Sequence, residues 1–442
     1  MKCLLYIPQY ECDGVHGKYT ANVRIGGLTI YERACRSIQA AKFDEIIVAK
    51  FDALEVKPDP LIKIGIRSFD FKSSPDEIST SLIDAIGSEN IAVCVLDAMV
   101  STDCFAMRPV GADVRITVGQ TQTGIYFLRN DSAIELLKTP HGLDKIESTV
   151  SDTYAAPDTA LYHKILTKED TKTGQNLLTK SLRKPLGRDA DGLVAYFINR
   201  PCSLQISKRI ANSPITPNMI TAIGLVIGLA AAALVALGNP TAMIVAVILW
   251  QISSMVDGID GELARMRLSP SHRGEWFDTI ADDITNITFM LGLGHGLYML
   301  GEDFPFLGPD SSIYYFYIAI AVCSLMVISV GWFYALFVKL GIASHNHFEW
   351  GFEADNKSNK SDEKRGFVKR IAEAIAGGFA WIAKRDFYTF LIMVLVICHL
   401  NKTAYFIMLT GASFVGLGGI IALTLRAIRS CFKKKNSSAT NM

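Results

Sequence analysis

The stretch ITPNMITAIGLVIGLAAAALVALGNPTAMIVAVILWQISSMV (215–256) contains no acidic or basic residue and no histidine. A helix that crosses the hydrocarbon core of a bilayer needs about 20 residues, so the stretch is long enough for two such helices. Glycine and proline interrupt regular structure, which makes Gly238-Asn239-Pro240 the natural break between the two. The sequence therefore predicts two membrane-spanning helices, near residues 219–237 and 241–257.

Further stretches with few charges follow this pair, at residues 284–301, 311–338, 387–401 and 403–425. They bring the predicted spans to six and indicate an all-α transmembrane domain. Lysine and arginine concentrate in alternate connections, for example at Arg265, Arg267 and Arg273, and again in the tail. Because basic residues accumulate on the cytosolic side of membrane proteins, we expect a multi-pass protein with both termini in the cytosol.

The first part of the chain has a different pattern. Short apolar runs rich in β-branched residues are typical of buried strands, and four of them occur: KCLLYIP (2–8), DEIIVAKF (44–51), NIAVCVLDA (90–98) and TGIYFLRN (123–130). Apolar residues at helical spacing lie between the first two runs. Strands that alternate with helices predict an α/β domain with a largely parallel sheet.

These changes of pattern divide the chain into four predicted segments. They are a cytosolic α/β domain (1–185), an interfacial linker (186–215), the six-helix transmembrane domain (216–430) and a basic cytosolic tail (431–442). In the linker, aromatic and aliphatic residues are mixed with lysine and arginine. That mixture is typical of an amphipathic helix lying in the membrane interface.

Composition narrows the possible partners. The chain has 44 Lys plus Arg and 43 Asp plus Glu, a formal net charge of +1, so no overall basic field is present to hold nucleic acid. The nine cysteines include no C-x-x-C pair. We therefore expect buried free thiols in a reducing compartment rather than a disulfide framework or a zinc site.

The segment DGIDGELARMRLSPSHRGEWFDTIAD (257–282) places four carboxylates where the second span reaches the cytosolic side. Asp257 and Asp260 are three residues apart and Asp278 and Asp282 are four apart, so each pair shares a helix face. An ionised aspartate at membrane depth costs about 2.5 to 3.5 kcal/mol, so these carboxylates require compensating positive charge. Oxygen ligands select hard cations, and two Mg²⁺ or Mn²⁺ ions balance the four charges. Such a two-metal site is the usual device for displacement at phosphorus.

Residues between the acids indicate a binding surface. Gly261 and Ala264 carry almost no side chain, which leaves room for a ligand flat against the helix. Arg265 offers a planar fork of donors for phosphate oxygens. Gly274 is expected at the turn into the third helix. A cation or proton transporter is the alternative, since intramembrane carboxylates also line transport pathways, but a transporter does not need this interleaved Gly, Ala and Arg.

The full pattern, D-x-x-D-G-x-x-A-R-x8-G-x-x-x-D-x-x-x-D, resembles the signature of the CDP-alcohol phosphotransferase family. It is matched at every fixed position: Asp257, Asp260, Gly261, Ala264, Arg265, Gly274, Asp278 and Asp282. The resemblance implies six membrane helices, a homodimer and a cavity that faces the cytosol. It also implies transfer of a phospho-alcohol group from a CDP-linked donor to an acceptor hydroxyl, with release of CMP.

The resemblance further implies roles for individual residues. The four aspartates would hold the metal ions, and Gly261, Ala264 and Arg265 would receive the cytidine diphosphate. Asp282 would also accept the proton of the acceptor hydroxyl, which requires that its own metal contact be partial or absent, because a tightly bound carboxylate is a poor base.

Two further positions have alternative interpretations. Asn218 and Thr221, in ITPNMIT (215–221), resemble residues of the family's first helix that reach the nucleotide, but in a membrane helix such side chains also make packing hydrogen bonds. Arg385, at the start of the fifth span, either binds an anionic acceptor or anchors the end of its helix.

In the α/β domain, GGLTIYERACRSIQAAKFDEIIVA (26–49) resembles nucleotidyltransferases, and Asp97 stands where those enzymes place a metal-binding aspartate. The segment IPQYECDGVHGKYTANVR (7–24) departs from their glycine-rich loop, whose backbone N–H groups cradle a triphosphate. We therefore expect a nucleotidyltransferase-like domain that has lost cytidylyltransferase activity and acts as a scaffold or regulator. An unconventional active site is the alternative.

The order of the two domains resembles bifunctional enzymes that make CDP-inositol and then transfer inositol phosphate. This resemblance favours a CDP-linked polar alcohol of the inositol type as donor, with CDP-diacylglycerol as the alternative. The acceptor would be a lipid or an inositol phosphate, and membrane lipid would surround the helices.

Overall fold

The computed structural model describes residues 1–340 and 384–417, with the exception of residues 10, 14–18, 53, 58, 110, 184, 186–190 and 415. The chain forms two compact units. The α/β unit consists of Met1–Arg183 together with two short segments, Ser207–Pro214 and Glu262–Ser269. The helical unit consists of Lys184–Ile206, Ile215–Gly261 and the chain from Pro270 onward.

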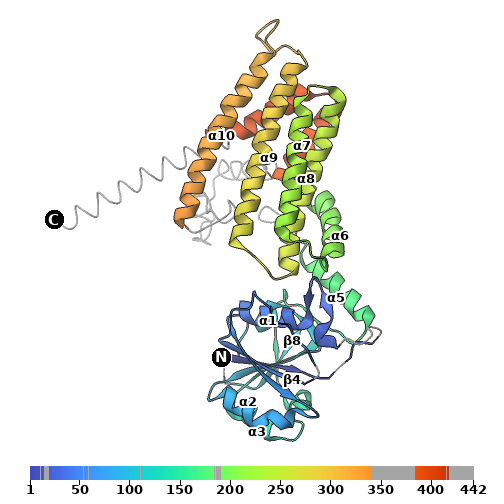
Figure 1. Ribbon diagram of the computed structural model, residues 1–442, viewed down its shortest axis with the longest axis vertical. Helices are drawn as coiled ribbons and strands as arrows, with labels where there is room; N and C mark the ends of the chain where they lie inside the picture. Colours follow the sequence, from blue (N-terminus) through green and yellow to red (C-terminus); the bar gives the residue numbers. More distant parts are fainter. Residues whose placement is uncertain are drawn as a thin grey trace, which may run out of the picture. The chain divides into compact units, whose positions relative to one another are not determined.

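The centre of the α/β unit is a seven-stranded sheet in the order β10-β8-β9-β6-β1-β4-β5 (Figure 1). Its strands are β1 (Lys2–Ile7), β4 (Glu45–Phe51), β5 (Gly65–Phe71), β6 (Ile91–Val95), β8 (Val114–Val118), β9 (Thr121–Leu128) and β10 (Thr153–Ala155). β1 pairs in parallel with β4 and β6, and β4 with β5, which confirms the predicted α/β class. β9 runs antiparallel to β6 and β8. A tight turn at Gly119 (φ 58°) joins β8 to β9, and it is too short for the crossover that a parallel pair needs.

Helices cover both faces of the sheet, with α1 on one side and α2 and α3 on the other (Figure 1). The helices are α1 (Ile30–Ala40), α2 (Ser79–Ile86), α3 (Asn130–Lys138), α4 (Ile146–Thr149) and α5 (Lys168–Ser181), with 3₁₀ turns η1 (Thr20–Asn22), η2 (Pro75–Ile78) and η3 (Thr102–Phe105). Two small antiparallel pairs complete the unit, β2 (Arg24–Ile25) with β3 (Leu28–Thr29) and β7 (Ala98–Val100) with β11 (Tyr162–Lys164).

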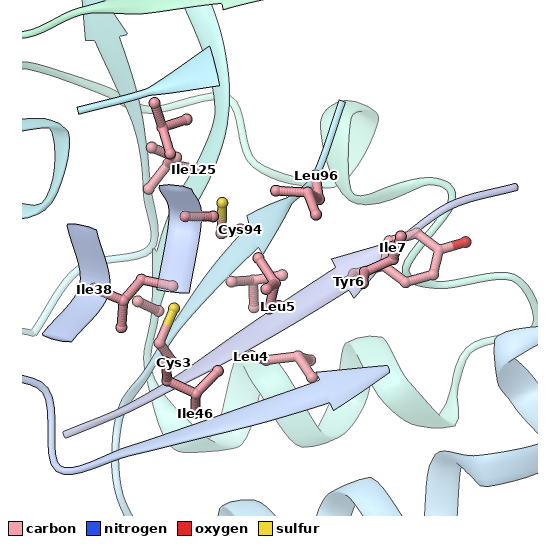
Figure 2. Packing of buried hydrophobic residues seen from close by; sticks show 14 of the residues in the cluster. Cys3, Leu4, Leu5, Tyr6, Ile7, Ile38, Ile46, Cys94, Leu96 and Ile125 are labelled. Atoms are coloured by element: carbon pink, nitrogen blue, oxygen red, sulfur yellow. The ribbon is translucent and has the colours of Figure 1, made fainter. Parts of the chain in front are cut away.

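Helix α1 shows how local sequence fixes one of these elements. The Thr29 side chain accepts a hydrogen bond from the Glu32 backbone N–H (3.0 Å), and the Glu32 carboxylate accepts one from the Thr29 N–H (2.8 Å). This capping box satisfies donors that the first helical turn leaves open. Figure 2 shows Ile38 of α1 close to Cys3 of β1, within the apolar core of the unit.

The cysteines of the described residues are all free thiols. Six are buried as predicted, and burial raises the pKa of the Cys35 thiol to about 12, which keeps it protonated and unreactive. Cys202 and Cys398 are exposed, contrary to the prediction. Each stands at a helix end, the first near the start of α6 and the second just after α12, where less of the chain covers it.

The helical unit contains η4 (Ala195–Asn199, a π-helical turn), α6 (Arg200–Ile210), α7 (Pro217–Ala236), α8 (Pro240–Met266), α9 (His272–Met299), α10 (Ile313–Leu340) and α12 (Arg385–Ile397). Residues 401–414 are also helical. The ends of α6 and α8 belong to the α/β unit. Thr216 caps α7 by accepting a hydrogen bond from the Met219 N–H (3.3 Å), and Pro217 occupies the first helical position, where its missing N–H costs nothing.

α7 and α9 pack closely because small residues line their contact. A Cβ atom at Gly292 or Gly296 would collide with the carbonyl oxygen of Ala232 or Val235. Such close backbone approach is typical of membrane helices, whose association depends on van der Waals packing. His295 lies on the same helix, with its Nδ1 2.8 Å from the Ala236 carbonyl oxygen, so it is a packing residue.

Three helices among the described residues are long and apolar enough to cross a membrane: Pro217–Ala236, Pro240–Met266 and Ile313–Leu336. They indicate a membrane protein. The predicted spans at 284–301 and 387–401 correspond to α9, whose first turns are polar, and to α12, which has only 13 residues. The predicted span at 403–425 lies partly, and the basic tail wholly, outside the described residues. The arrangement of six spans therefore stays a prediction.

Candidate active site

Three carboxylates of the helical unit converge on one place. Asp257 comes from α8, and Asp278 and Asp282 come from successive turns of α9. One oxygen atom of each lies within 4.8 Å of the corresponding atoms of the other two. Within the described part of the chain, this is the group of acidic, histidine or cysteine side chains arranged closely enough to share a metal ion.

Asp260 lies outside that group, although the sequence predicted four carboxylates together. Its Oδ2 accepts a hydrogen bond from the Thr221 hydroxyl of α7 (2.5 Å), and its Oδ1 accepts one from the Gly261 N–H (2.5 Å). Three residues advance a helix by about 300°, so Asp260 points about 60° away from Asp257. Thr221 thus makes a hydrogen bond between helices, and its contact with a nucleotide stays a prediction.

Arg385 brings positive charge to the carboxylates from a third helix. Its Nη1 forms an ion pair with Asp282 and lies 3.2 Å from Asp257 Oδ1. The neighbouring Asp386 accepts a hydrogen bond from the Ala195 N–H (2.7 Å), which fixes the first turn of α12 against η4. The helix end is therefore anchored by Asp386, while Arg385 enters the carboxylate cluster.

The cluster retains an unsatisfied requirement for positive charge. Asp278 Oδ1 is buried and has no hydrogen-bond partner. A carboxylate oxygen without a partner in a buried site is costly, and a cation is the simplest group that satisfies it. An all-oxygen set of donors suits Mg²⁺ or Mn²⁺ rather than zinc or copper. The residues present therefore fit a divalent metal ion.

The other predicted site residues differ in exposure. Arg265 and Asn218 are exposed, and Gly261 and Ala264 are half-buried. Gly274, expected at the turn into the third helix, lies inside the first turn of α9. A Cβ atom there would lie 3.2 Å from Asn218 Oδ1, so glycine at this position permits the close approach of α7.

Two further contacts lie beside the cluster, and the sequence did not identify the partner in either. Arg200 of α6 forms an ion pair with Asp191 (Nε to Oδ2, 3.0 Å), and its Nη1 would lie 3.2 Å from a Cβ atom on Gly258. Arg200 therefore occupies the space that Gly258 leaves beside Asp257. Asp283, next to Asp282, accepts a hydrogen bond from the Tyr334 hydroxyl of α10 (2.5 Å). Gly258, which follows Asp257 directly, is the signal in the sequence for this contact, because a glycine beside a site residue leaves room for another side chain, here Arg200.

In the α/β unit, Asp97 is held by protein groups. Its Oδ2 lies 3.0 Å from Lys164 Nζ and its Oδ1 accepts a hydrogen bond from the Tyr162 hydroxyl (3.2 Å). Burial and the charge of Asp97 raise the pKa of Tyr162, so this hydroxyl remains a donor. Among the described residues no further acidic side chains join Asp97 in a group that could hold a metal ion.

Comparisons with known proteins agree with the geometry of the helical unit. Residues 214–421 match the model of the CDP-alcohol phosphatidyltransferase family. The chain is 35% identical over 133 residues to a protein of Archaeoglobus fulgidus named "Bifunctional IPC transferase and DIPP synthase", a match over 30% of this chain and 26% of the relative. A protein of the same name from Thermococcus kodakarensis is 33% identical over 129 residues, 29% of this chain and 28% of the relative. The matches thus span only about a quarter of each relative's length.

Among solved structures, the chain is similar to HddC from Yersinia pseudotuberculosis, with 11% identity over 40% of this chain and 99% of that one. The TM-score of 0.31 is too low to establish a shared fold. The family match, by contrast, covers the helices that carry all four aspartates and Arg385. Residues 214–421 are therefore similar to CDP-alcohol phosphatidyltransferases over the part of the chain that carries the carboxylate cluster.

Proposed function

We propose that this chain transfers a phospho-alcohol group from a CDP-linked alcohol to an acceptor hydroxyl, with release of CMP. The carboxylate cluster of Asp257, Asp278 and Asp282 carries this proposal, because its buried, partnerless oxygen, Asp278 Oδ1, fits a divalent metal ion. The family match of residues 214–421 supports the same reaction class.

The chain's own residues have distinct roles in the proposed reaction. Asp257, Asp278 and Asp282, with Asp260 at the edge, would hold two Mg²⁺ or Mn²⁺ ions, which when bound offset the charge of the phosphates. Arg265 would bind the diphosphate of the donor with its guanidinium fork, beside the small residues Gly261 and Ala264.

The transfer exchanges one bond to phosphorus for another. The oxygen of the acceptor hydroxyl attacks the β-phosphorus, its proton passes to Asp282, and the bond between that phosphorus and the bridging oxygen breaks. CMP leaves with the bridging oxygen. Arg385, already paired with Asp282 and Asp257, would bind an anionic group of the acceptor from the side of α12.

An inositol-type alcohol is the donor that we propose. Two observations support it: the printed names of the relatives, and an α/β unit that precedes most of the helical unit. We further propose a homodimer whose helices cross the membrane several times, with both termini and the active site in the cytosol.

The donor is tested by supplying the purified full-length protein with CDP-inositol or CDP-diacylglycerol, Mg²⁺ and a panel of acceptors. We expect CMP from CDP-inositol with inositol phosphate or a lipid hydroxyl as acceptor. CMP release from CDP-diacylglycerol alone would instead identify a phospholipid synthase. No CMP from either donor would contradict the proposed reaction class.

We propose that the α/β unit lacks cytidylyltransferase activity. Asp97 pairs with Lys164, and a lysine ammonium at 3.0 Å competes directly with a metal ion for the same carboxylate. Full-length protein incubated with CTP, inositol phosphate and Mg²⁺ is therefore expected to release no pyrophosphate. Pyrophosphate release that disappears in an Asp97→Asn variant would show that the unit keeps an active site of its own.

A further inference from the structure

The end of α8 is a turn whose carbonyl groups accept hydrogen bonds from helix α1. The Ser269 N–H donates to the Ala264 carbonyl (2.9 Å) and the Leu268 N–H to the Arg265 carbonyl (3.2 Å), the pattern of a Schellman turn. The residue at the turn, Leu268, has φ 45°, a left-handed conformation that favours glycine. We call residues 262–269 the signature turn, because they contain Ala264 and Arg265.

Two arginines of α1 donate hydrogen bonds to backbone carbonyl groups of the signature turn. Arg33 Nη2 donates to the Met266 carbonyl (2.7 Å) and to the Ile25 carbonyl (2.8 Å). Arg36 Nη1 donates to the Arg267 carbonyl (2.5 Å) while its other nitrogens form an ion pair with Asp59. Cations at a helix C-terminus are favourable, because that end carries partial negative charge.

Burial and an ion pair hold these two arginine side chains in fixed positions. Arg33 is only 3% exposed, and burial lowers its pKa to about 10, so it still carries its charge at neutral pH. A buried cation needs acceptors, and two carbonyl groups supply them. Asp59 holds the Arg36 guanidinium through two nitrogen atoms, at 2.6 and 2.9 Å.

Packing holds the signature turn on its other sides. Leu263 and Met266 are fully buried in the same apolar cluster as Leu178 and Ala211. Arg267 donates to the carbonyl groups of Ala211 (2.9 Å) and Ser213 (2.7 Å). Gly27 (φ 88°) lies directly against Arg267, where a Cβ atom would approach its Nε to 2.8 Å. The turn is thus enclosed by three segments of the α/β unit, while Arg265 itself stays exposed.

We infer that the α/β unit is a positioning domain for the signature turn, and that Arg33 and Arg36 are positioning residues for donor binding. They fix the backbone at Met266 and Arg267, and so fix the direction in which the adjacent Arg265 presents its guanidinium. This inference rests on the proposed function, in which Arg265 binds the donor's diphosphate. The α/β unit thereby contributes to the affinity for the CDP-linked donor.

The test uses full-length Arg33→Met and Arg36→Lys. Lysine at 36 keeps the charge that pairs with Asp59 but cannot also reach the Arg267 carbonyl, so this variant is expected to fold. For both variants we expect the KM for the CDP-linked donor to rise about 10-fold, while kcat and the KM for the acceptor change less than about twofold. The reason is that the lost contact with the donor is equally strong in the bound substrate and in the transition state. Calorimetric titration with CDP should show the same weakening without turnover.

Rescue and a matched control separate positioning from general stability. Leu268→Gly favours the left-handed turn without help, so adding it to Arg36→Lys should restore the donor KM. Arg67→Gln removes an arginine of the same unit from an exposed pair with Glu45, and should leave both KM values unchanged.

Failure of this inference can be distinguished from failure of the proposed function by comparing the wild-type protein with the arginine variants. If the wild-type protein releases no CMP from any CDP-alcohol, the proposed function fails first. If the wild-type protein is active and both arginine variants keep its donor KM and its affinity for CDP, the inference is wrong. A loss that affects donor and acceptor equally, and that Leu268→Gly does not restore, would also overturn it.

Discussion

Replacing Asp278 with asparagine is expected to reduce CMP release more than about 100-fold, beyond the loss usually seen when a group that only supports a metal ligand is removed. Asp278 Oδ1 is a buried oxygen of the cluster that has no hydrogen-bond partner. An amide in place of the carboxylate removes one negative charge and can turn a donor toward the cation. The variant should nevertheless fold. With chelator present its melting temperature should equal or exceed that of the wild-type protein, because one of three mutually repelling carboxylates is gone.

The neighbouring acid on the same helix is the matched control. Asp283 accepts a hydrogen bond from the Tyr334 hydroxyl and lies outside the carboxylate cluster. The Asp283→Asn variant should therefore keep most of the activity. Steady-state CMP release and thermal unfolding of both variants, with Mg²⁺ and with chelator, make the comparison. Full activity in Asp278→Asn would exclude the cluster from the reaction.

Replacing Arg385 with glutamine is expected to lower stability in chelator by up to about 3 kcal/mol. The substitution leaves Asp257 and Asp282 without their shared cation in a largely buried site, and breaking such a pair costs more than the pair contributes. Mg²⁺ should recover most of this loss, because a bound cation supplies the missing charge. CMP release should remain low even with Mg²⁺, since the proposed contact with the acceptor is also lost.

An exposed ion pair provides the control for Arg385. Lys402 and Glu302 are each about 40% exposed, so Lys402→Gln should change stability by less than about 1 kcal/mol with or without Mg²⁺. Thermal unfolding across a Mg²⁺ titration distinguishes the two variants. If Arg385→Gln were as stable as the wild-type protein in chelator, the ion pairs with Asp257 and Asp282 would have no energetic role.

Features with a strong local cause were predictable from the sequence. The uncharged stretch before Asp257 and the break at Pro240 anticipate α7 and α8 closely, since length and hydropathy decide a membrane helix. The short β-branched runs anticipate β1, β4, β6 and β9. The direction of β9 was not predicted, because it depends on the length of the turn at Gly119 and not on the composition of the strand.

Parts of the site that depend on distant contacts could not be predicted. The spacing of Asp257 and Asp260 suggests a shared face, but which of them turns toward Thr221 depends on how α7 packs. Arg385 lies 103 residues after Asp282, and only the fold brings the two together. Arg33 donates to the backbone carbonyl of Met266. Every residue has such a carbonyl, so the side chain at position 266 gives no sign of this contact in the sequence.

The central claim is that the carboxylate cluster performs metal-dependent transfer from a CDP-linked alcohol. The most direct test is CMP formation by purified full-length protein given a CDP-alcohol and an acceptor, first with Mg²⁺ and then with excess chelator. We predict CMP with Mg²⁺, loss of CMP formation with chelator, and recovery when Mg²⁺ or Mn²⁺ is restored. CMP formation that continues unchanged in chelator would contradict the claim.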